Sequence, residues 1–170
     1  MGGPSNGLRK MYVIDAQDRK ILRHLMEDAS VSFKEVASAV GLATSTVYER
    51  VRRLRDAGLL LGQHAEVAPA AFGVNLQAML FVQLSTHSVE AFETFQTHLE
   101  SLDAVLGFYN MAGKQDFAIH LAATDADQLR EMILRDFTSR PEVQFLETNL
   151  IFEHRRFHRL PQTDGGYSGA

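Results

Sequence analysis

Two short amphipathic helices joined by a tight turn are the strongest constraint in this sequence. They occupy residues 32–54, S-F-K-E-V-A-S-A-V-G-L-A-T-S-T-V-Y-E-R-V-R-R-L. Ser32 and Glu35 have the spacing of a capping box, which predicts that the first helix begins after Ser32. Gly41 accepts the left-handed backbone conformation that ends many helices. A second helix is expected over residues 44–57, so the segment has the order of a helix-turn-helix.

The second helix of this motif has an apolar side and a polar side. Val47, Val51 and Leu54 recur at the helical period and are expected to face the core. The opposite side carries groups that can contact base edges and phosphates in a major groove. A solvated face on an ordinary helix bundle has the same pattern, so both interpretations stay open for the motif alone. The residues predicted to bind DNA are Thr44, Ser45, Thr46, Tyr48, Glu49, Arg50, Arg52 and Arg53 on this helix, with Ser32 and Lys34 on the preceding one.

Four of these residues have specific or alternative roles. Arg50 lies beside the apolar stripe and also suits an internal ion pair, and Tyr48 also suits packing. Ser32 and Lys34 stand where backbone amides and a positive charge can hold a phosphate. Most of the affinity for DNA is expected to come from backbone contacts and to fall as salt is added.

The flanking residues complete a predicted winged helix-turn-helix domain over residues 14–67. Asp15 is expected to cap a first helix. After the third helix, residues 59–67 are apolar at first, contain a turn glycine and then alternate, which predicts a small β-wing. The buried stripe of the first helix is expected to be Ile21, Leu22, Leu25 and Met26.

The pattern changes from helical periodicity to alternation after residues 68–74, which are expected to be a hinge linker because they contain Pro69 and Gly73. Residues 75–160 then predict the order β-α-β-β-α-β. This is the ferredoxin-like pattern, an antiparallel four-stranded sheet with two helices on one face, so the chain is predicted to be α+β. The expected strands are residues 76–84, 105–112, 117–123 and 143–152, and the expected inward residues of the helices are Phe92, Phe95, Leu99 and Leu102, then Leu129, Met132, Ile133 and Phe137.

The face of this sheet that no helix covers is expected to carry apolar side chains. Met79 and Phe81 lie on it, with some of Phe108, Tyr109 and Met111. A sheet face in contact with water is normally polar, so we predict a homodimer in which a second sheet covers these side chains. Scattered surface apolar residues, which are also normal, are the alternative. Two-fold symmetry suits proteins that read pseudo-palindromic DNA sites.

The composition excludes several classes of protein. The 170 residues contain no cysteine, which rules out disulfides, Cys-type zinc sites and thiol catalysis. No stretch approaches the roughly 20 apolar residues that span a bilayer, and residues 1–7 lack the apolar core of a signal peptide. A cytoplasmic protein without a membrane partner is therefore expected. The ends, residues 1–13 and 161–170, are expected to be a flexible and a disordered tail.

Charge is distributed unevenly along the chain. Residues 1–66 contain ten Lys and Arg against eight Asp and Glu, a net charge of +2. Residues 67–170 contain seven against thirteen, a net charge of −6. This difference gives modest support to DNA binding by the first part.

Five segments follow one another in order between Ile14 and Phe152. They are I-D-A-Q-D-R-K-I-L, E-V-A-S-A-V-G-L, V-Y-E-R-V-R-R-L-R-D-A-G-L-L, G-Q-H-A-E-V-A-P-A-A-F-G and A-G-K-Q-D-F. Each is weak alone, but their order and spacing over nearly the whole chain are specific. In these segments the chain resembles the Lrp/AsnC, or feast/famine, family of transcription regulators.

The resemblance implies how such a chain would work. The third helix would enter the major groove, the C-terminal sheets would form a dimer, and dimers would often assemble into octamers. Many members of the family bind a free amino acid between dimers, near the turn that is here Gly113–Asp116. Two residues depart from the family pattern. Ala43 stands where a serine cap is usual, a loss of about 1 kcal/mol unless Thr44 takes over, and His64 stands where tyrosine is frequent.

The turn and the last strand supply the predicted effector site. Gly113 would let backbone N–H groups approach a ligand carboxylate, and Asp116 would accept the ligand ammonium. An ordinary hairpin turn, in which Gly and Asp serve only the backbone, is the alternative. The residues predicted to bind the effector are Gly113, Lys114, Gln115, Asp116, Thr148 and Asn149.

The leading hypothesis is a sequence-specific, DNA-binding transcription regulator that responds to a small effector such as an amino acid. It is expected to be no enzyme and to need no cofactor or metal. One alternative is an enzyme like the sirohaem decarboxylases on the same architecture, for which His120 and Tyr109 are candidates. Another is an architectural DNA-binding protein without an effector. His154 and His158 are spaced like metal ligands on a helix, but no third ligand stands nearby in the sequence.

Overall fold

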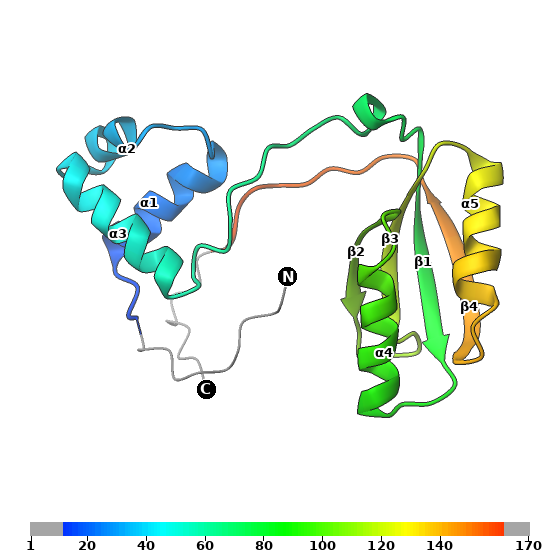
Figure 1. Cartoon of the computed structure of the whole chain (residues 1–170). Helices are drawn as coiled ribbons and strands as arrows, with labels where there is room; N and C mark the ends of the chain where they lie inside the picture. Colours follow the sequence, from blue (N-terminus) through cyan, green and yellow to red (C-terminus); the bar gives the residue numbers. More distant parts are fainter. Residues whose placement is uncertain (1–11, 162–170) are drawn as a thin grey trace. The chain divides into compact units, whose positions relative to one another are not determined.

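The computed structural model describes residues 12–161 and divides the chain into two units (Figure 1). The first contains the chain up to Glu66 together with the residues from Arg156 onward, and the second contains Val67–Arg155. The domain bounds expected from the sequence, 14–67 and 75–160, stay a prediction, because a division into compact units does not test them.

The two predicted tails lie outside the described residues except for Tyr12, Val13 and Pro161. Between residues 12 and 161, no helix is long and apolar enough to cross a membrane.

The first unit contains the three predicted helices, which are α1 (Ala16–Glu27), α2 (Phe33–Val40) and α3 (Thr44–Asp56). Capping boxes begin α1 and α2. At α1, the Asp15 carboxylate accepts a hydrogen bond from the Asp18 amide at 2.8 Å, and the Asp18 carboxylate accepts one from the Asp15 amide at 3.1 Å. Local sequence chemistry therefore sets where these helices begin.

Gly41 ends α2 and sets the turn into α3. Its φ of 71° lies in the left-handed region, while a β carbon at this position would meet nothing within 4 Å. The backbone conformation, rather than lack of space, therefore favours glycine here. The turn brings Val36 and Val40 of α2 into one buried core with Val47 and Val51 of α3, which confirms the predicted helix-turn-helix.

The predicted β-wing after α3 does not form. Residues 61–68 have no regular secondary structure, because a strand needs a partner for its backbone hydrogen bonds and the described sheet pairs only four strands of the second unit. Side chains hold this segment instead. Gln63 Oε1 accepts a hydrogen bond from the Arg55 guanidinium at 3.3 Å, and the Gln63 amide donates one to the Ala29 carbonyl at 3.3 Å.

The helix α3 begins without a side-chain cap. Ala43 has the extended backbone of an N-cap residue, with φ −70° and ψ 145°, and it makes no capping hydrogen bond. The suggestion that Thr44 takes over by a one-residue shift is wrong. The Thr46 and Val47 amides bond to the Ala43 carbonyl at 3.0 and 3.1 Å, which fixes Ala43 at the boundary and makes Thr44 the first helical residue.

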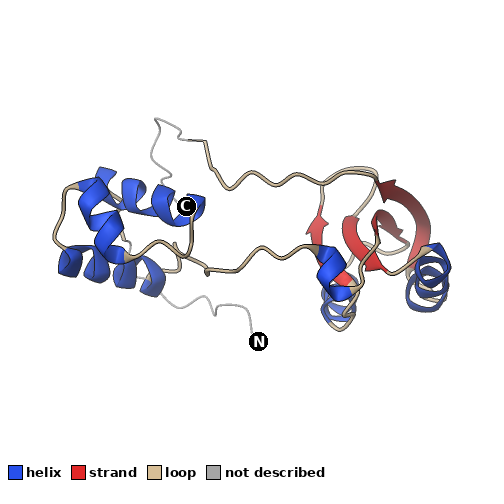
Figure 2. Cartoon of the chain, turned by 90° about the horizontal axis from the view of Figure 1, so that it is seen from above, coloured by secondary structure: helices blue, strands red, loops and turns tan. Residues whose placement is uncertain are grey.

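The second unit is a four-stranded antiparallel sheet in the order β2-β3-β1-β4. Two helices, α4 (Val89–Glu100) and α5 (Ala126–Met132), lie on the same face of this sheet (Figure 2). The predicted α+β, ferredoxin-like architecture is confirmed. The strands are β1 (Leu76–Leu84), β2 (Val105–Asn110), β3 (Phe117–Ala123) and β4 (Val143–Ile151), and a short 3₁₀ helix, η1 (Pro69–Phe72), precedes β1.

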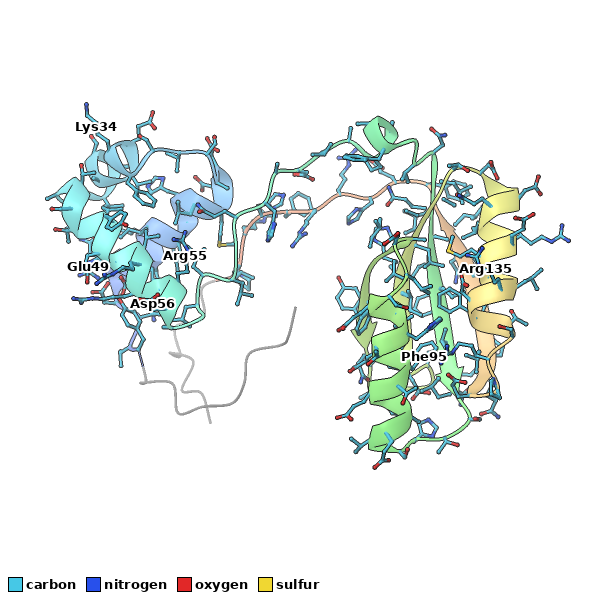
Figure 3. The ribbon with its side chains drawn as sticks, in the orientation of Figure 1. Lys34, Glu49, Arg55, Asp56, Phe95 and Arg135 are labelled. Atoms are coloured by element: carbon cyan, nitrogen blue, oxygen red, sulfur yellow. The ribbon has the colours of Figure 1, made fainter. Side chains whose placement is uncertain are left out.

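The core of the second unit lies between the sheet and its helices. Every second residue of β1 from Ala78 to Leu84 is fully buried, as the alternation predicted. Phe95 of α4, labelled in Figure 3, packs against Phe117 of β3 with the ring centroids 5.0 Å apart. Aromatic contacts of this kind join α4 to the sheet.

The last helix changes its geometry, where the sequence predicted one uniform helix. Residues Ile133–Thr138 continue α5 as a π-helix, η2. Met132 and Phe137 are both buried, 4% and 0% exposed, although they are five residues apart. The wider turn of a π-helix brings residues at this spacing to the same side.

The open face of the sheet carries both polar and apolar side chains. Met79 and Phe81 lie on it, partly buried, in register with His120 and Ala118 of β3. Tyr109 lies on the same face and is 67% exposed. Phe108 points to the opposite, helix-covered side, where it packs against the core. Of this aromatic pair only Tyr109 belongs to the open face, because neighbouring residues of a strand point to opposite faces.

Candidate nucleic-acid interface and ligand-binding turn

The outer side of α3 is the first candidate site. Ser45, Thr46 and Arg53 are exposed along it, and they line an open concavity of about 590 Å³ together with Tyr12 and Asp15, which lie before α1. Because Val47, Val51 and Leu54 are buried, the helix is held with this side outward. The predicted contact residues Ser45, Thr46 and Arg53 therefore lie on one continuous surface, and Thr44 is exposed at its start.

A surface network of charges occupies the middle of this helix. Glu49, labelled in Figure 3, accepts hydrogen bonds from Arg52 at 2.9 Å and from Arg53 at 3.3 Å. The hydrogen bond from Arg52, followed by the positive charges of both arginines, lowers the pKa of the Glu49 carboxyl. Both arginine side chains remain about 60% exposed. Pairs this exposed stabilise a helix little, so the arginines can exchange Glu49 for another anion.

Arg50 forms an ion pair inside the first unit, which was the alternative to DNA binding that its position suggested. Its Nη1 lies 2.7 Å from Asp15 Oδ2 and 2.8 Å from Asp18 Oδ1. The Asp18 side chain is only 1% exposed. A backbone hydrogen bond from Asp18 and the Arg50 guanidinium hold the pKa of Asp15 below its usual value, and the same pairing raises the pKa of Arg50. These contacts support α3 against α1 and leave Arg50 less available to DNA than its neighbours.

The remaining predicted DNA contacts lie at the edges of this surface. Tyr48 is 59% exposed, and its ring meets Phe33 edge to face at 6.1 Å. The Ser32 hydroxyl is used in the capping box with Glu35. Lys34 is exposed at the start of α2 and extends away from the unit (Figure 3). Lys34 is thus available to a phosphate, whereas Ser32 already has partners.

The turn between β2 and β3 is the second candidate site, and its own chain holds it in place. The Asp116 side chain is 8% exposed and lies 3.1 Å from His87 Nε2. Its other oxygen accepts a hydrogen bond from the Leu84 amide at 2.7 Å. The Asp116 amide also donates to the Val82 carbonyl at 2.9 Å. The carboxylate that was assigned to a ligand ammonium is therefore already used in joining the turn to the end of β1.

The six predicted effector residues do not come together within one chain. Gly113 and Lys114 are exposed in the turn, and Gln115 is partly buried. Thr148 and Asn149 belong to β4, which is separated from β3 by β1. Thr148 pairs with Leu80, and Asn149 pairs with Met79. Because these two are neighbours on a strand, they also point to opposite faces of the sheet.

The histidines of interest make contacts at two separate places. His120 Nε2 lies 2.7 Å from Gln77 Oε1, and its ring packs edge to face against His154 at 5.4 Å. Burial, followed by the neighbouring His154, lowers the pKa of His120. His158 Nε2 lies 3.0 Å from Glu66 Oε2. The segment that contains His154 and His158 is not helical, and no cluster of three metal-ligating side chains occurs among residues 12–161.

Sequence reasoning missed two structural residues of these sites. Asp18 was not recognised as the buried partner of Arg50, although its spacing from Asp15 is that of a capping box. His87 was not connected with Asp116, and no local signal links residues that are 29 positions apart. Both interactions arise from tertiary contacts.

Two protein-family models match the chain. The model of the AsnC-type helix-turn-helix domain matches residues 14–55, and that of the Lrp/AsnC ligand binding domain matches residues 77–160. The HTH-type transcriptional regulator AldR of Mycolicibacterium smegmatis is 37% identical over 143 residues, which are 84% of this chain and 84% of that protein.

Solved structures extend the similarity to three dimensions. The structure of Escherichia coli AsnC has a TM-score of 0.75 and 26% identity, covering 87% of this chain and 100% of that chain. The leucine response regulatory protein of Mycobacterium tuberculosis has a TM-score of 0.72 and 27% identity, with coverages of 87% and 99%. The similarity therefore includes both units.

Proposed function

Because this chain belongs to the Lrp/AsnC family of DNA-binding transcription regulators, we propose that it reads DNA through α3 and responds to an amino acid bound between copies of the chain. The observation that carries the proposal is the outer side of α3, where Ser45 and Thr46 are exposed beside Arg52 and Arg53. We assign base contacts to Ser45 and Thr46, since hydroxyl groups can bond to either base edge. We assign phosphate contacts to the two arginines and to Lys34.

A homodimer formed through the open face of the sheet is the proposed assembly. Met79, Phe81 and Tyr109 give this face an apolar centre, and a second copy would remove it from water. A two-fold dimer would present two α3 helices to half-sites about one helical turn of DNA apart. Further assembly of dimers into octamers is proposed from membership of the family.

An amino acid is the proposed effector. The second unit matches a ligand binding domain, and one relative is named a leucine response regulatory protein. Backbone N–H groups near Gly113 and the Lys114 cation suit a ligand carboxylate. Because Asp116 already has partners, the ligand ammonium would need an acceptor from a neighbouring copy. Thr148 and Asn149 are alternative candidates for it, since they point to opposite faces of the sheet.

The names of the relatives favour a transcription regulator over the enzyme alternative. A transcription regulator that binds DNA would act in the cytoplasm. His120 and Tyr109, the residues considered for sirohaem chemistry, lie on the open sheet face, which is the face proposed for the dimer. Adding sirohaem and recording its absorbance over time would reveal a decarboxylase.

A titration with the DNA upstream of the protein's own gene tests the proposal. It is run at two salt concentrations, with and without a mixture of the twenty amino acids. Saturable binding that survives competitor DNA and shifts with one amino acid would support the whole proposal. Specific binding without any shift would remove the effector, and the absence of specific binding would remove the assignment of α3.

A double variant tests whether α3 makes base contacts. Ser45→Ala with Thr46→Val should weaken binding to the target by about 1–3 kcal/mol for each base that is no longer read, while binding to unrelated DNA stays the same. The matched control is Thr94→Val, a change at an exposed position of α4. Equal losses on target and unrelated DNA would contradict the assignment of base contacts.

A further inference from the structure

The helix-turn-helix residues themselves carry no excess of positive charge. Residues 12–66 contain eight Lys and Arg and eight Asp and Glu, a net charge of zero. The second unit, Val67–Arg155, contains five against twelve, a net charge of −7. Binding to a polyanion depends strongly on Lys and Arg that neutralise phosphates, so further cations of the first unit become important.

The end of the described chain brings two such cations to the first unit. Arg156–Pro161 is grouped with the helix-turn-helix rather than with the sheet, and it contains Arg156 and Arg159. One side-chain contact joins this segment to the first unit's main segment, because His158 Nε2 lies 3.0 Å from Glu66 Oε2. Two arginines thus belong to the same compact unit as the DNA-binding motif, although they follow it by more than a hundred residues in the sequence.

Neither of these arginines is used by a carboxylate in the described structure. Arg155, which belongs to the second unit, is paired with Glu153 at 2.6 Å. Among residues 12–161, Arg156 has no hydrogen-bond or ion-pair partner. The Arg159 guanidinium lies over the Phe157 ring at 4.9 Å, a contact that leaves its N–H edge open. Both side chains are exposed.

We propose that Arg156 and Arg159 form an auxiliary phosphate-binding strip, which contacts the backbone of the DNA that α3 reads. The proposal rests on the DNA-binding role of α3. An extended chain separates residues three apart by roughly 10 Å, and long arginine side chains can adjust this span to neighbouring phosphates. Guanidinium groups match phosphate oxygens in two-pronged hydrogen bonds. Such contacts add affinity and fix orientation without reading sequence.

The test compares the salt dependence of DNA binding for two charge-matched double variants of the full chain. Arg156→Gln with Arg159→Gln removes the strip. Arg130→Gln with Arg135→Gln removes two exposed charges from the second unit. Binding constants are measured by fluorescence anisotropy on target and unrelated duplexes at several salt concentrations between about 50 and 200 mM.

The strip variant should bind about tenfold more weakly or worse at the lowest salt, and equally so on both duplexes. Its slope of log K against log salt should become shallower by about 0.9 for each phosphate that is no longer neutralised, or about 1.8 per chain. The control should keep the slope of the unaltered protein. Arg156→Lys with Arg159→Lys should restore most of the slope, because counterion release depends on charge rather than on guanidinium shape.

Each contrary result points to a different failure. If the unaltered protein binds the target and the strip variant has the same slope, the strip is overturned while α3 keeps its role. If the unaltered protein shows no saturable binding, the role of α3 itself has failed. An unchanged slope with a smaller mass by light scattering would mean that the arginines bind the acidic unit of a second copy, which also overturns the phosphate contact.

Discussion

At the scale of single residues, the contact between Arg50 and Asp18 supports the first unit most directly. The Asp18 side chain is almost completely buried, and Arg50 is its cationic partner at 2.8 Å. Arg50→Met would keep much of the side-chain volume and leave a buried carboxylate without its charge partner. We expect a loss of about 3 kcal/mol in the free energy of unfolding of this unit, measured by urea denaturation.

The control for this prediction is Arg52→Met on the same helix, whose pair with Glu49 is exposed. It should change stability by less than about 0.5 kcal/mol. Arg50→Met combined with Asp18→Leu should recover part of the loss, because no unpaired charge then remains buried. Equal effects of Arg50→Met and Arg52→Met would contradict the importance of burial.

His120 makes the stability of the second unit depend on pH. Burial is the larger cause that lowers its pKa, and His154 is the smaller one. The unfolded chain therefore takes up a proton near pH 6.5, whereas the folded chain takes it up only at lower pH. Stability should fall as the pH drops from about 6.5 towards the folded pKa and should then level off with respect to this group.

Titration by NMR and urea denaturation at several pH values measure this effect. His120→Gln should flatten the dependence on pH below 6.5. His154→Gln should raise the pKa of His120 by only the smaller part of its shift, because burial remains. A His120 pKa that returns to its ordinary value in His154→Gln would show that charge, and not burial, is the main cause.

At the scale of elements, the uncapped start of α3 predicts a stabilising substitution. Ala43 has the N-cap backbone but no side-chain oxygen. Ala43→Ser should supply a hydrogen bond to a free helical amide and raise the free energy of unfolding by about 1 kcal/mol. Ala39→Ser, at an exposed position in the interior of α2, is the control and should be neutral or slightly destabilising. A gain at both positions would rule out capping as the cause.

The elements that could be predicted from the sequence are those whose signals are local. The capping residues Asp15 and Ser32, the turn residue Gly41 and the alternation of β1 depend on neighbouring residues, and the structure confirms them. The prediction of a β-wing was wrong because a strand needs a partner segment for its backbone hydrogen bonds. The π-helical η2 was missed because its widened turn follows from packing of Phe137.

In the candidate sites, too, only the features with local sequence signals could be predicted. The exposed side of α3 follows from the spacing of Val47, Val51 and Leu54, which are buried as expected. The use of Asp116 by Leu84 and His87, and the separation of Thr148 from the turn, depend on strand order and register. The sequence alone does not directly show the order of the strands in the sheet or their register.

At the scale of the whole molecule, the open sheet face makes the proposed assembly testable. Phe81 lies at the centre of this face, between Ala118 of β3 and Glu147 of β4. If the proposed dimer forms through this face, Phe81→Glu should convert it to a monomer, because a charge there would be buried beside a second copy. Light scattering measures the mass, and circular dichroism checks that the sheet remains.

The control is Val89→Glu, which introduces the same charge at a 70% exposed position at the start of α4. It should leave the mass unchanged. A dimer that survives Phe81→Glu would exclude the open face as the interface.

The grouping of Arg156–Pro161 with the helix-turn-helix also has a consequence for the order in which the protein is made. A ribosome completes α1, α2 and α3 first and then synthesises Val67–Arg155 before it reaches the last residues of the same unit. At roughly 5–20 residues per second, that delay is on the order of 5–20 seconds. The nascent chain therefore has its helix-turn-helix before it has the contact between Glu66 and His158, which forms only after residues 156–161 have been synthesised.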